Sequence, residues 1–205
     1  MSTQTAKLVA RIAENLPDMS GPQMQGWIEN PKRLKQVLSV LAEIPSDPKV
    51  WKRITLGTGI KDADGFRRSL KDNNMRIGDW ANDIIGKPAF SVATEKMDVD
   101  LVVVSVAELG FPNGATLKDI YASAKKRGLE LCPNEVGPQL RLQYKDQPKD
   151  EWFVIGMEPI ADSVGDLGLF SVEHDSYGLW LDTYYGYPDR VWNEYYRFVF
   201  VLPRK

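Results

Sequence analysis

Residues 179–201 read "LWLDTYYGYPDRVWNEYYRFVFV" and place two Trp, five Tyr and two Phe in 23 positions. Both ends of this stretch are strand-like, and successive side chains of a strand point to opposite sides. In the first run, alternation predicts that Trp180, Asp182 and Tyr184 share one side. The stretch is therefore predicted to form two strands of a sheet, separated by a loop around the "GYP" turn residues.

The C-terminal third of the sequence contains further strand-like runs before the aromatic stretch. Between its strand-like runs stand segments rich in Pro, Gly, Asp and Ser, which favour turns. Short and even spacing of this kind favours antiparallel neighbours, as in a meander or small barrel, and we expect no helix after residue 139. The predicted strands are "QLRLQY" (139–144), "EWFVIGME" (151–158), "LFSVEH" (169–174), "GLWLDTY" (178–184) and "YYRFVFV" (195–201).

The middle of the chain mixes strands with helices. "VDLVVVSVAELG" (99–110) is a β-branched run typical of a strand buried on both sides, and a shorter strand is expected at 52–56. Asp62 or Asp64 can cap a helix that carries Phe66 and Leu70 on one side. The fold class is thus predicted to be α+β, with an N-terminal helical hairpin, a mixed middle and a C-terminal antiparallel sheet.

Two domains are predicted. Residues 1–45 indicate a helical hairpin, whose second helix is capped by Asn30, has Pro31 at its first position and ends at Ile44. The segment "PSDPK" links this hairpin to an α+β module at residues 50–205. Within the module, similar turn and helix patterns at 51–90 and 105–144 indicate a diverged internal duplication.

Composition limits the chemistry that is available to this protein. The 205 residues include one Cys and one His, so several His or Cys ligands cannot form a zinc site within one chain. Nothing in the sequence indicates a cofactor or another metal site. The chain begins without an apolar signal segment and contains no run long enough to cross a bilayer, which predicts a cytoplasmic protein without a membrane partner.

Charge is unevenly distributed along the chain. Residues 151–205 contain nine Asp or Glu against four Lys or Arg, so this region would repel a nucleic acid backbone. Residues 51–90 have the opposite excess, eight basic against five acidic residues. Because residues 63–86 also resemble a helix-turn-helix in outline, a small DNA-binding regulator is one alternative, but nucleic acid is not the expected partner.

The loop of the aromatic stretch supplies the candidate binding site. Tyr and Trp beside charged groups in a surface loop suit recognition of a protein or peptide, and a glycan is a second possible partner. We therefore favour a non-enzymatic binding module over an enzyme; the alternative is that the rings cap one end of the sheet. The predicted binding residues are Tyr184, Tyr185, Tyr187, Asp189, Arg190 and Trp192.

Two kinds of catalysis remain as alternatives. A hydrolase acting on glycans could use two carboxylates across a cleft, and Glu158, Glu173 and Asp182 lie near aromatic residues in the sequence. A nucleophilic thiol would require Cys132 to meet His174 in the fold. No catalytic residue is assigned from the sequence alone.

Four blocks of the sequence resemble one family. They are "IGDWANDIIGKPAF", "DLVVVSVAELGF", "LELCPNEVGPQLRLQY" and "RFVFVLPR", all within residues 50–205. The sequence is similar there to uncharacterised hypothetical proteins of bacterial and environmental genomes. That resemblance implies a self-contained module at residues 50–205, and it implies no activity and no catalytic residue.

Overall fold

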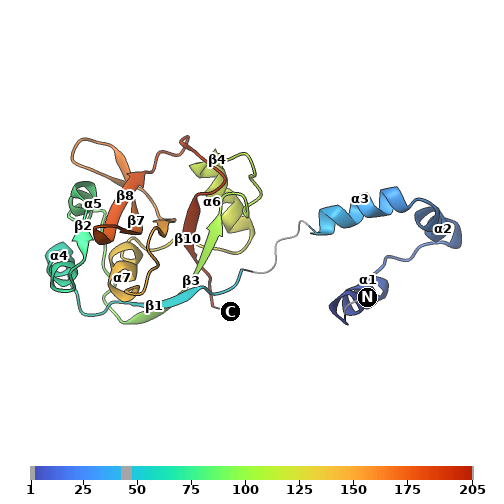
Figure 1. The fold of residues 1–205 in the computed structure, drawn as a ribbon, viewed down its shortest axis with the longest axis horizontal. Helices are drawn as coiled ribbons and strands as arrows, with labels where there is room; N and C mark the ends of the chain where they lie inside the picture. Colours follow the sequence, from blue (N-terminus) through green and yellow to red (C-terminus); the bar gives the residue numbers. More distant parts are fainter. Residues whose placement is uncertain (1–2, 43–47, 205) are drawn as a thin grey trace. The chain divides into compact units, whose positions relative to one another are not determined.

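The computed structural model describes residues 3–42 and 48–204 of the chain. These residues form two compact units, Met1–Ser46 and Asp47–Lys205. Because the units are not placed relative to each other, each is described by itself (Figure 1).

The N-terminal unit contains three helices, one more than the sequence predicted. They are α1 (Thr3–Glu14), α2 (Gly21–Glu29) and α3 (Pro31–Ala42). The additional helix α2 starts where the Ser20 N–H donates to Gln23 Oε1 (2.9 Å), one half of a capping box. Asn30 caps α3 as expected, because its Oδ1 accepts the Arg33 N–H (3.2 Å), while the expected helix end at Ile44 lies outside the described residues.

A large mixed sheet forms the centre of the C-terminal unit. Its strands follow the order β1-β3-β10-β5-β7-β8-β2, and β6 pairs with β7 beside this path. The pairs β10–β5 and β2–β8 are parallel, whereas the other pairs are antiparallel. The bounds are β1 (Lys52–Leu56), β2 (Arg76–Ile77), β3 (Met97–Ser105), β5 (Trp152–Ile155), β6 (Ile160–Ala161), β7 (Leu167–Asp175), β8 (Gly178–Tyr185) and β10 (Arg197–Val201).

Helices cover the two sides of this sheet unequally (Figure 1). They are α4 (Ala63–Asp72), α5 (Asp79–Ile84), α6 (Leu117–Lys126) and α7 (Val136–Gln143). The register puts Phe170 and Phe200 on opposite sides. Phe170 contacts α7 and, through Phe90, α4, while Phe200 packs against Tyr121 of α6. Buried side chains on both sides make the core, and the predicted α+β class is confirmed.

Helix α7 corrects one sequence prediction. Residues 139–144 were expected to form a strand, but Gln139–Gln143 form the second half of α7 instead. The helix lies so close to the sheet that a Cβ on Gly137 would be 2.7 Å from Phe170. Residues 136–141 are all buried, polar ones included, which removes the apolar stripe by which a surface helix is recognised.

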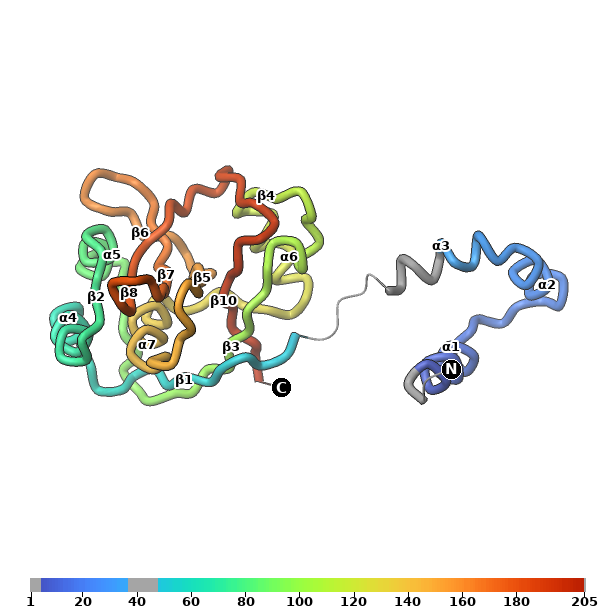
Figure 2. The backbone as a smooth tube through the Cα atoms, viewed as in Figure 1, coloured from blue at the N-terminus to red at the C-terminus, as the bar shows by residue number. Residues whose placement is uncertain are grey.

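The segment between β8 and β10, residues 186–196, is anchored to α6 (Figure 2). It contains β9 (Val191–Trp192), which pairs with β4 (Ala115–Thr116) in a separate two-stranded sheet. The Lys118 N–H donates to Pro188 O (3.0 Å), and the Leu117 N–H donates to Arg190 O (3.1 Å). The predicted surface loop is thus fastened by backbone hydrogen bonds to the first turn of a helix.

None of the helices among the described residues combines the length and the apolar character that a membrane span requires.

Candidate functional site

Six side chains of the C-terminal unit form one partly exposed surface, which we call the acidic aromatic face. Cross-strand register aligns Trp152 of β5, Glu173 of β7 and Trp180 of β8 on the same side of the sheet. Asp182 and Tyr184 follow Trp180 at alternate positions of β8, as the sequence predicted. The face consists of Trp152, Glu173, Trp180, Asp182, Tyr184 and Tyr196, and all six are partly exposed.

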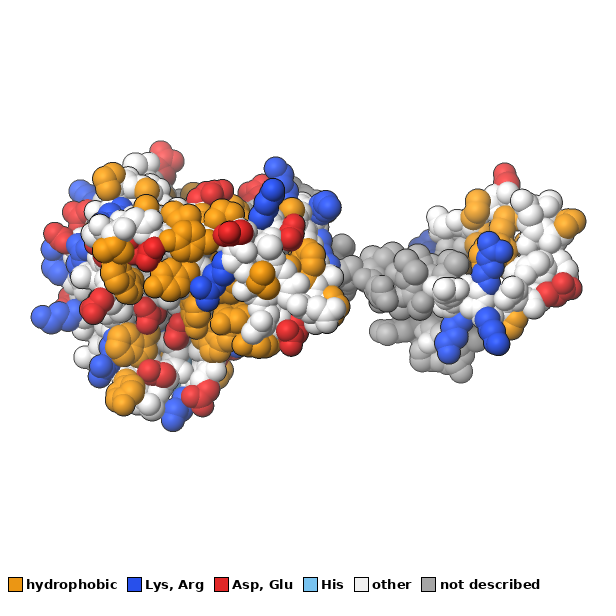
Figure 3. All heavy atoms as spheres, turned by 90° about the horizontal axis from the view of Figure 1, so that it is seen from above, with side chains coloured by type: hydrophobic (Ala, Val, Ile, Leu, Met, Phe, Trp, Pro, Cys, Tyr) orange, Lys and Arg blue, Asp and Glu red, His pale blue; other side chains and the backbone are white. Residues whose placement is uncertain are grey.

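Ring contacts hold one half of the face together. The Trp152 ring centroid lies 4.9 Å from that of Tyr196 and 6.0 Å from that of Tyr184. Tyr184 and Tyr196 contact each other edge to face at 5.9 Å. Such pairs stabilise aromatic clusters beyond the area that they bury. Figure 3 shows hydrophobic side chains gathered on the C-terminal unit, with acidic side chains among them.

Two carboxylates lie among these rings. Glu173 Oε1 accepts the Ser171 hydroxyl (2.7 Å), and Asp182 Oδ1 accepts the Thr183 N–H (2.8 Å). Asp182 fits because its neighbour is Gly78, where an added Cβ would lie 2.3 Å from Oδ1. In the described part of the chain, neither Glu173 nor Asp182 has an ion-pair partner.

The electrostatics of the face disfavour further negative charge. Burial raises the pKa of Glu173, and the charges of Asp182 and Asp175 raise it further. Burial likewise raises the pKa of Asp182, together with the charge of Asp79. Burial and the Glu173 charge raise the pKa of Tyr184 to about 12. Perturbed ionisable groups in one place are typical of functional sites.

An arginine of the same chain occupies one end of the face. Arg76 of β2 lies over the Trp180 ring (5.2 Å to its centroid) and near Tyr177 (6.0 Å). Asp175 Oδ1 accepts the Trp180 Nε1–H (2.9 Å), and the Arg76 charge helps to lower the pKa of Asp175 against the effect of its burial. This arrangement combines a ring, a carboxylate and a stacked arginine.

The predicted binding residues do not form one surface, because some are exposed and one is buried. Tyr184 belongs to the face, whereas Trp192 is 1% exposed and packs against Tyr196 and Phe198. Arg190 covers the rings of Tyr185 (5.7 Å) and Trp192 (5.2 Å). The most exposed members are Tyr185 (50%), Tyr187 (36%), whose ring stacks on Tyr185, and Asp189.

Five members of the face were not among the predicted binding residues. Glu173 and Asp182 had been named only as candidates for glycan hydrolysis, and Trp152, Trp180 and Tyr196 had been given no role. Trp180 had already been placed with Asp182 and Tyr184 by alternation, so a sequence signal existed for it. Trp152 joins them only because β5 pairs with β7, and Tyr196 only because β10 lies beside β5. Those pairings carry no local signal in the sequence.

Three residues suggested for catalysis, Glu158, Cys132 and His174, are not part of this face. Glu158 is exposed and lies near Tyr121 of α6, so it does not join Glu173 and Asp182. Cys132 is buried, its pKa is raised by burial, and its Sγ donates to Val199 O (3.4 Å). His174 Nδ1 lies instead 2.6 Å from Gln147 O, so the thiol and the imidazole are not bonded to each other.

The segment proposed for DNA recognition is built into the fold. Between α4 and α5 the chain forms β2, which pairs with β8, and α5 has only six residues. Arg67 donates to Asn82 Oδ1 (2.6 Å) and to Asp64 Oδ1 (2.7 Å), which ties α4 to α5. Arg76 lies over Trp180. Two basic residues of this segment, Arg67 and Arg76, therefore have partners within the protein.

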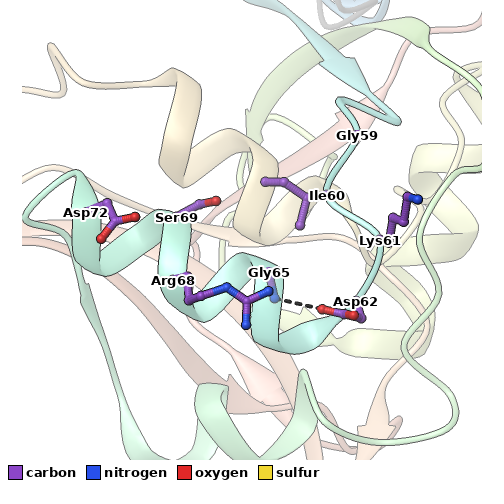
Figure 4. A pocket seen from close by; sticks show the side chains of 8 residues that line it. All are labelled: Gly59, Ile60, Lys61, Asp62, Gly65, Arg68, Ser69 and Asp72. Atoms are coloured by element: carbon purple, nitrogen blue, oxygen red, sulfur yellow. Dashed lines mark hydrogen bonds between the residues drawn. The ribbon is translucent and has the colours of Figure 1, made fainter.

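A depression of about 390 Å³ lies at the start of α4 (Figure 4). It is lined by residues 59–62 and by Gly65, Arg68, Ser69 and Asp72 of the helix. Asp62 Oδ1 accepts the Gly65 N–H (2.7 Å) there, so the predicted helix cap already occupies the position that an anion would take. Across the described residues, no three His, Cys, Asp or Glu side chains are grouped to hold a metal ion.

Comparisons with family models, with curated proteins and with solved structures found no match to this chain.

Proposed function

We propose that this protein is a non-enzymatic binding module, and that its acidic aromatic face holds a segment of a protein or peptide. The supporting observation is that Glu173 lies in register between Trp152 and Trp180, partly exposed and without a cation of its own. Rings and carboxylates of this kind are common at the centres of protein interfaces, where aromatic residues contribute most of the binding energy.

Several exposed rings extend the face outward. Tyr177 is 71% and Tyr195 is 56% exposed, and Tyr195 stacks on Tyr196 (5.1 Å between centroids). Both of these rings lie in turns beside strands, whereas Trp152, Trp180 and Tyr184 of the face lie on strands. Large rings presented by strands are held rigidly, so little conformational entropy is lost when a partner covers them. An extended peptide lying across β5, β7 and β8 would contact several of these rings at once.

Selection from a random displayed peptide library tests this proposal. Selected peptides are synthesised and their binding is measured by fluorescence anisotropy. We expect Trp152→Ala to weaken binding about tenfold or more, because central aromatic residues commonly contribute about 2 kcal/mol. Trp80→Ala is the matched control, since it removes an exposed tryptophan of α5 that lies outside the face. Equal binding by the wild type and a folded Trp152→Ala variant would refute the proposal.

A carboxylate-dependent hydrolase acting on glycans is the second candidate. The observation in its favour is that Glu173 and Asp182 lie diagonally on neighbouring strands, beside aromatic rings, and that the pKa of Glu173 is raised by its burial and further by the Asp182 charge. Such a pair could divide acid and nucleophile roles. Wild-type protein is incubated with a panel of chromogenic glycosides and polysaccharides; turnover that Glu173→Gln abolishes would establish this function in place of simple binding.

A further inference from the structure

We propose that the acidic aromatic face binds an arginine side chain of its partner, held between Glu173 and Asp182 against the rings of Trp152 and Tyr184. This inference rests on the proposed binding function and names the chemical group that would be recognised. It starts from a comparison of two neighbouring parts of the same face.

One part already contains an arginine. Arg76 lies over Trp180, and Asp175, which bonds the Trp180 indole, supplies the carboxylate charge. In the neighbouring part, Trp152 and Tyr184 provide the rings and Glu173 and Asp182 provide two carboxylates. The components are the same, but no cation of the described chain lies there as a partner of these carboxylates. The part around Glu173 and Asp182 therefore has the rings and carboxylates of the part around Trp180, but it lacks an arginine.

The chemistry of the site favours arginine over lysine. A guanidinium group is planar, stacks on aromatic rings and can bond two carboxylate oxygens side by side. It is also hydrated more weakly than an ammonium group, so it enters a partly buried site at lower cost. The protein uses arginine in this manner at other rings too, since Arg190 covers Tyr185 and Trp192, and Arg197 lies 4.5 Å from the Phe153 centroid.

A bound cation would also relieve the repulsion between the carboxylates of the site. The charges of Asp182 and Asp175 act on Glu173, and the charge of Asp79 acts on Asp182. The Arg190 charge acts on Tyr184 and is not among the causes of the pKa shift of either carboxylate. Each carboxylate retains an oxygen that accepts no hydrogen bond from the described residues. Those two oxygens are the expected acceptors for the guanidinium N–H groups.

Three short peptides test the assignment: acetyl-Gly-Arg-Gly-amide, its lysine analogue and its citrulline analogue, which has the shape of arginine without the charge. Binding is followed by two-dimensional NMR, with the tryptophan indole signals as a local readout. We expect the arginine peptide to shift the Trp152 indole signal and to bind more tightly than either analogue. Equal affinity for the lysine or the citrulline peptide would overturn the assignment.

Variants in which the carboxylates are replaced by neutral amides test whether Glu173 and Asp182 bind the arginine. The double variant Glu173→Gln with Asp182→Asn should bind the arginine peptide about tenfold or more weakly, because bonds to charged groups contribute about 1.5–3 kcal/mol. The control is Glu158→Gln, which removes one exposed carboxylate near α6 and should leave affinity unchanged. Unchanged binding by the double variant would refute the proposal.

The two proposals can fail separately. If selected peptides depend on Trp152 but bind the double variant as tightly as the wild type, the binding function stands and the arginine site is refuted. If binding of selected peptides does not depend on Trp152, the binding function through this face fails as well.

Discussion

At the scale of single residues, Glu173 illustrates how a charge held in a proposed binding site lowers the stability of the fold. The raised pKa of Glu173 means that the folded protein holds this proton more tightly than the unfolded chain does. The free energy of unfolding therefore decreases as the pH rises from the ordinary carboxyl value, about 4.3, through the raised pKa of the folded state. Above that range the folded protein retains a charge in an unfavourable place.

Replacement of Glu173 should remove the destabilisation that its charge causes. Because Gln cannot ionise, Glu173→Gln should be more stable than the wild type at neutral pH, and the difference should disappear below about pH 4. Urea denaturation at a series of pH values measures it. A variant that is less stable than the wild type at neutral pH would show that the Glu173 charge is stabilised in the fold.

Trp192 contributes packing without a hydrogen bond. Its ring is almost completely buried between Tyr196, Phe198 and Arg190, and its Nε1 has no hydrogen-bond partner among the described residues. Trp192→Ala should therefore destabilise the protein by about 3–5 kcal/mol through the cavity that it leaves. Trp192→Phe should cost much less, because no bonded donor is lost. Thermal and urea denaturation of both variants checks this difference, and equal losses would contradict it.

At the scale of elements, the start of α4 depends on one side chain. The Asp62 carboxylate accepts the Gly65 N–H, and loss of such a cap typically costs about 1 kcal/mol. We expect Asp62→Ala to lower the free energy of unfolding by about that amount. Asp72→Ala, at the other end of the same helix, is the control and should not destabilise, because a negative charge is unfavourable near a helix C-terminus. Comparable losses in both variants would argue against the cap.

Elements with a local signal could be predicted from the sequence. The strand at 52–56 and a helix capped by Asp62 or Asp64 were expected from apolar pattern and capping chemistry. The structure confirms the strand and shows that Asp62 is the cap. The prediction of a strand at residues 139–144, where the structure has helix α7, was wrong. Gln139 and Arg141 are polar residues that are buried in the helix, so "QLRLQY" shows the alternation of polar and apolar residues that is typical of a strand. Pro138 near the helix start, after the turn residues "PNE", was the signal that could have indicated it.

The candidate site was predictable only along single strands. Alternation correctly grouped Trp180, Asp182 and Tyr184, because the direction of side chains is a local property of a strand. Glu173 and Trp152 come beside them through pairing between strands, which depends on the whole sheet. The burial of Trp192 likewise follows from the pairing of β9 with β4, about 75 residues earlier in the chain.

At the scale of the whole molecule, the two units differ in how completely they bury apolar side chains. The core consists of residues of the C-terminal unit, whereas Leu8, Ile28 and Leu34 of the N-terminal helices are exposed. A chain of residues 48–205 should therefore fold alone with a cooperative thermal transition close to that of the full chain. Circular dichroism melting of both chains measures it; a truncated protein without a cooperative transition would show that the helices are required for folding.

The position of β10 has a consequence for synthesis in the cell. Residues 197–201 follow every other strand of this sheet in the sequence, yet they lie in the middle of the sheet, between β3 and β5. Until they emerge, both neighbouring strands expose unpaired backbone edges, which is a state prone to wrong pairing. During synthesis the sheet therefore stays open until residues 197–201 have emerged, and a chain that stops before residue 197 would lack a completed sheet.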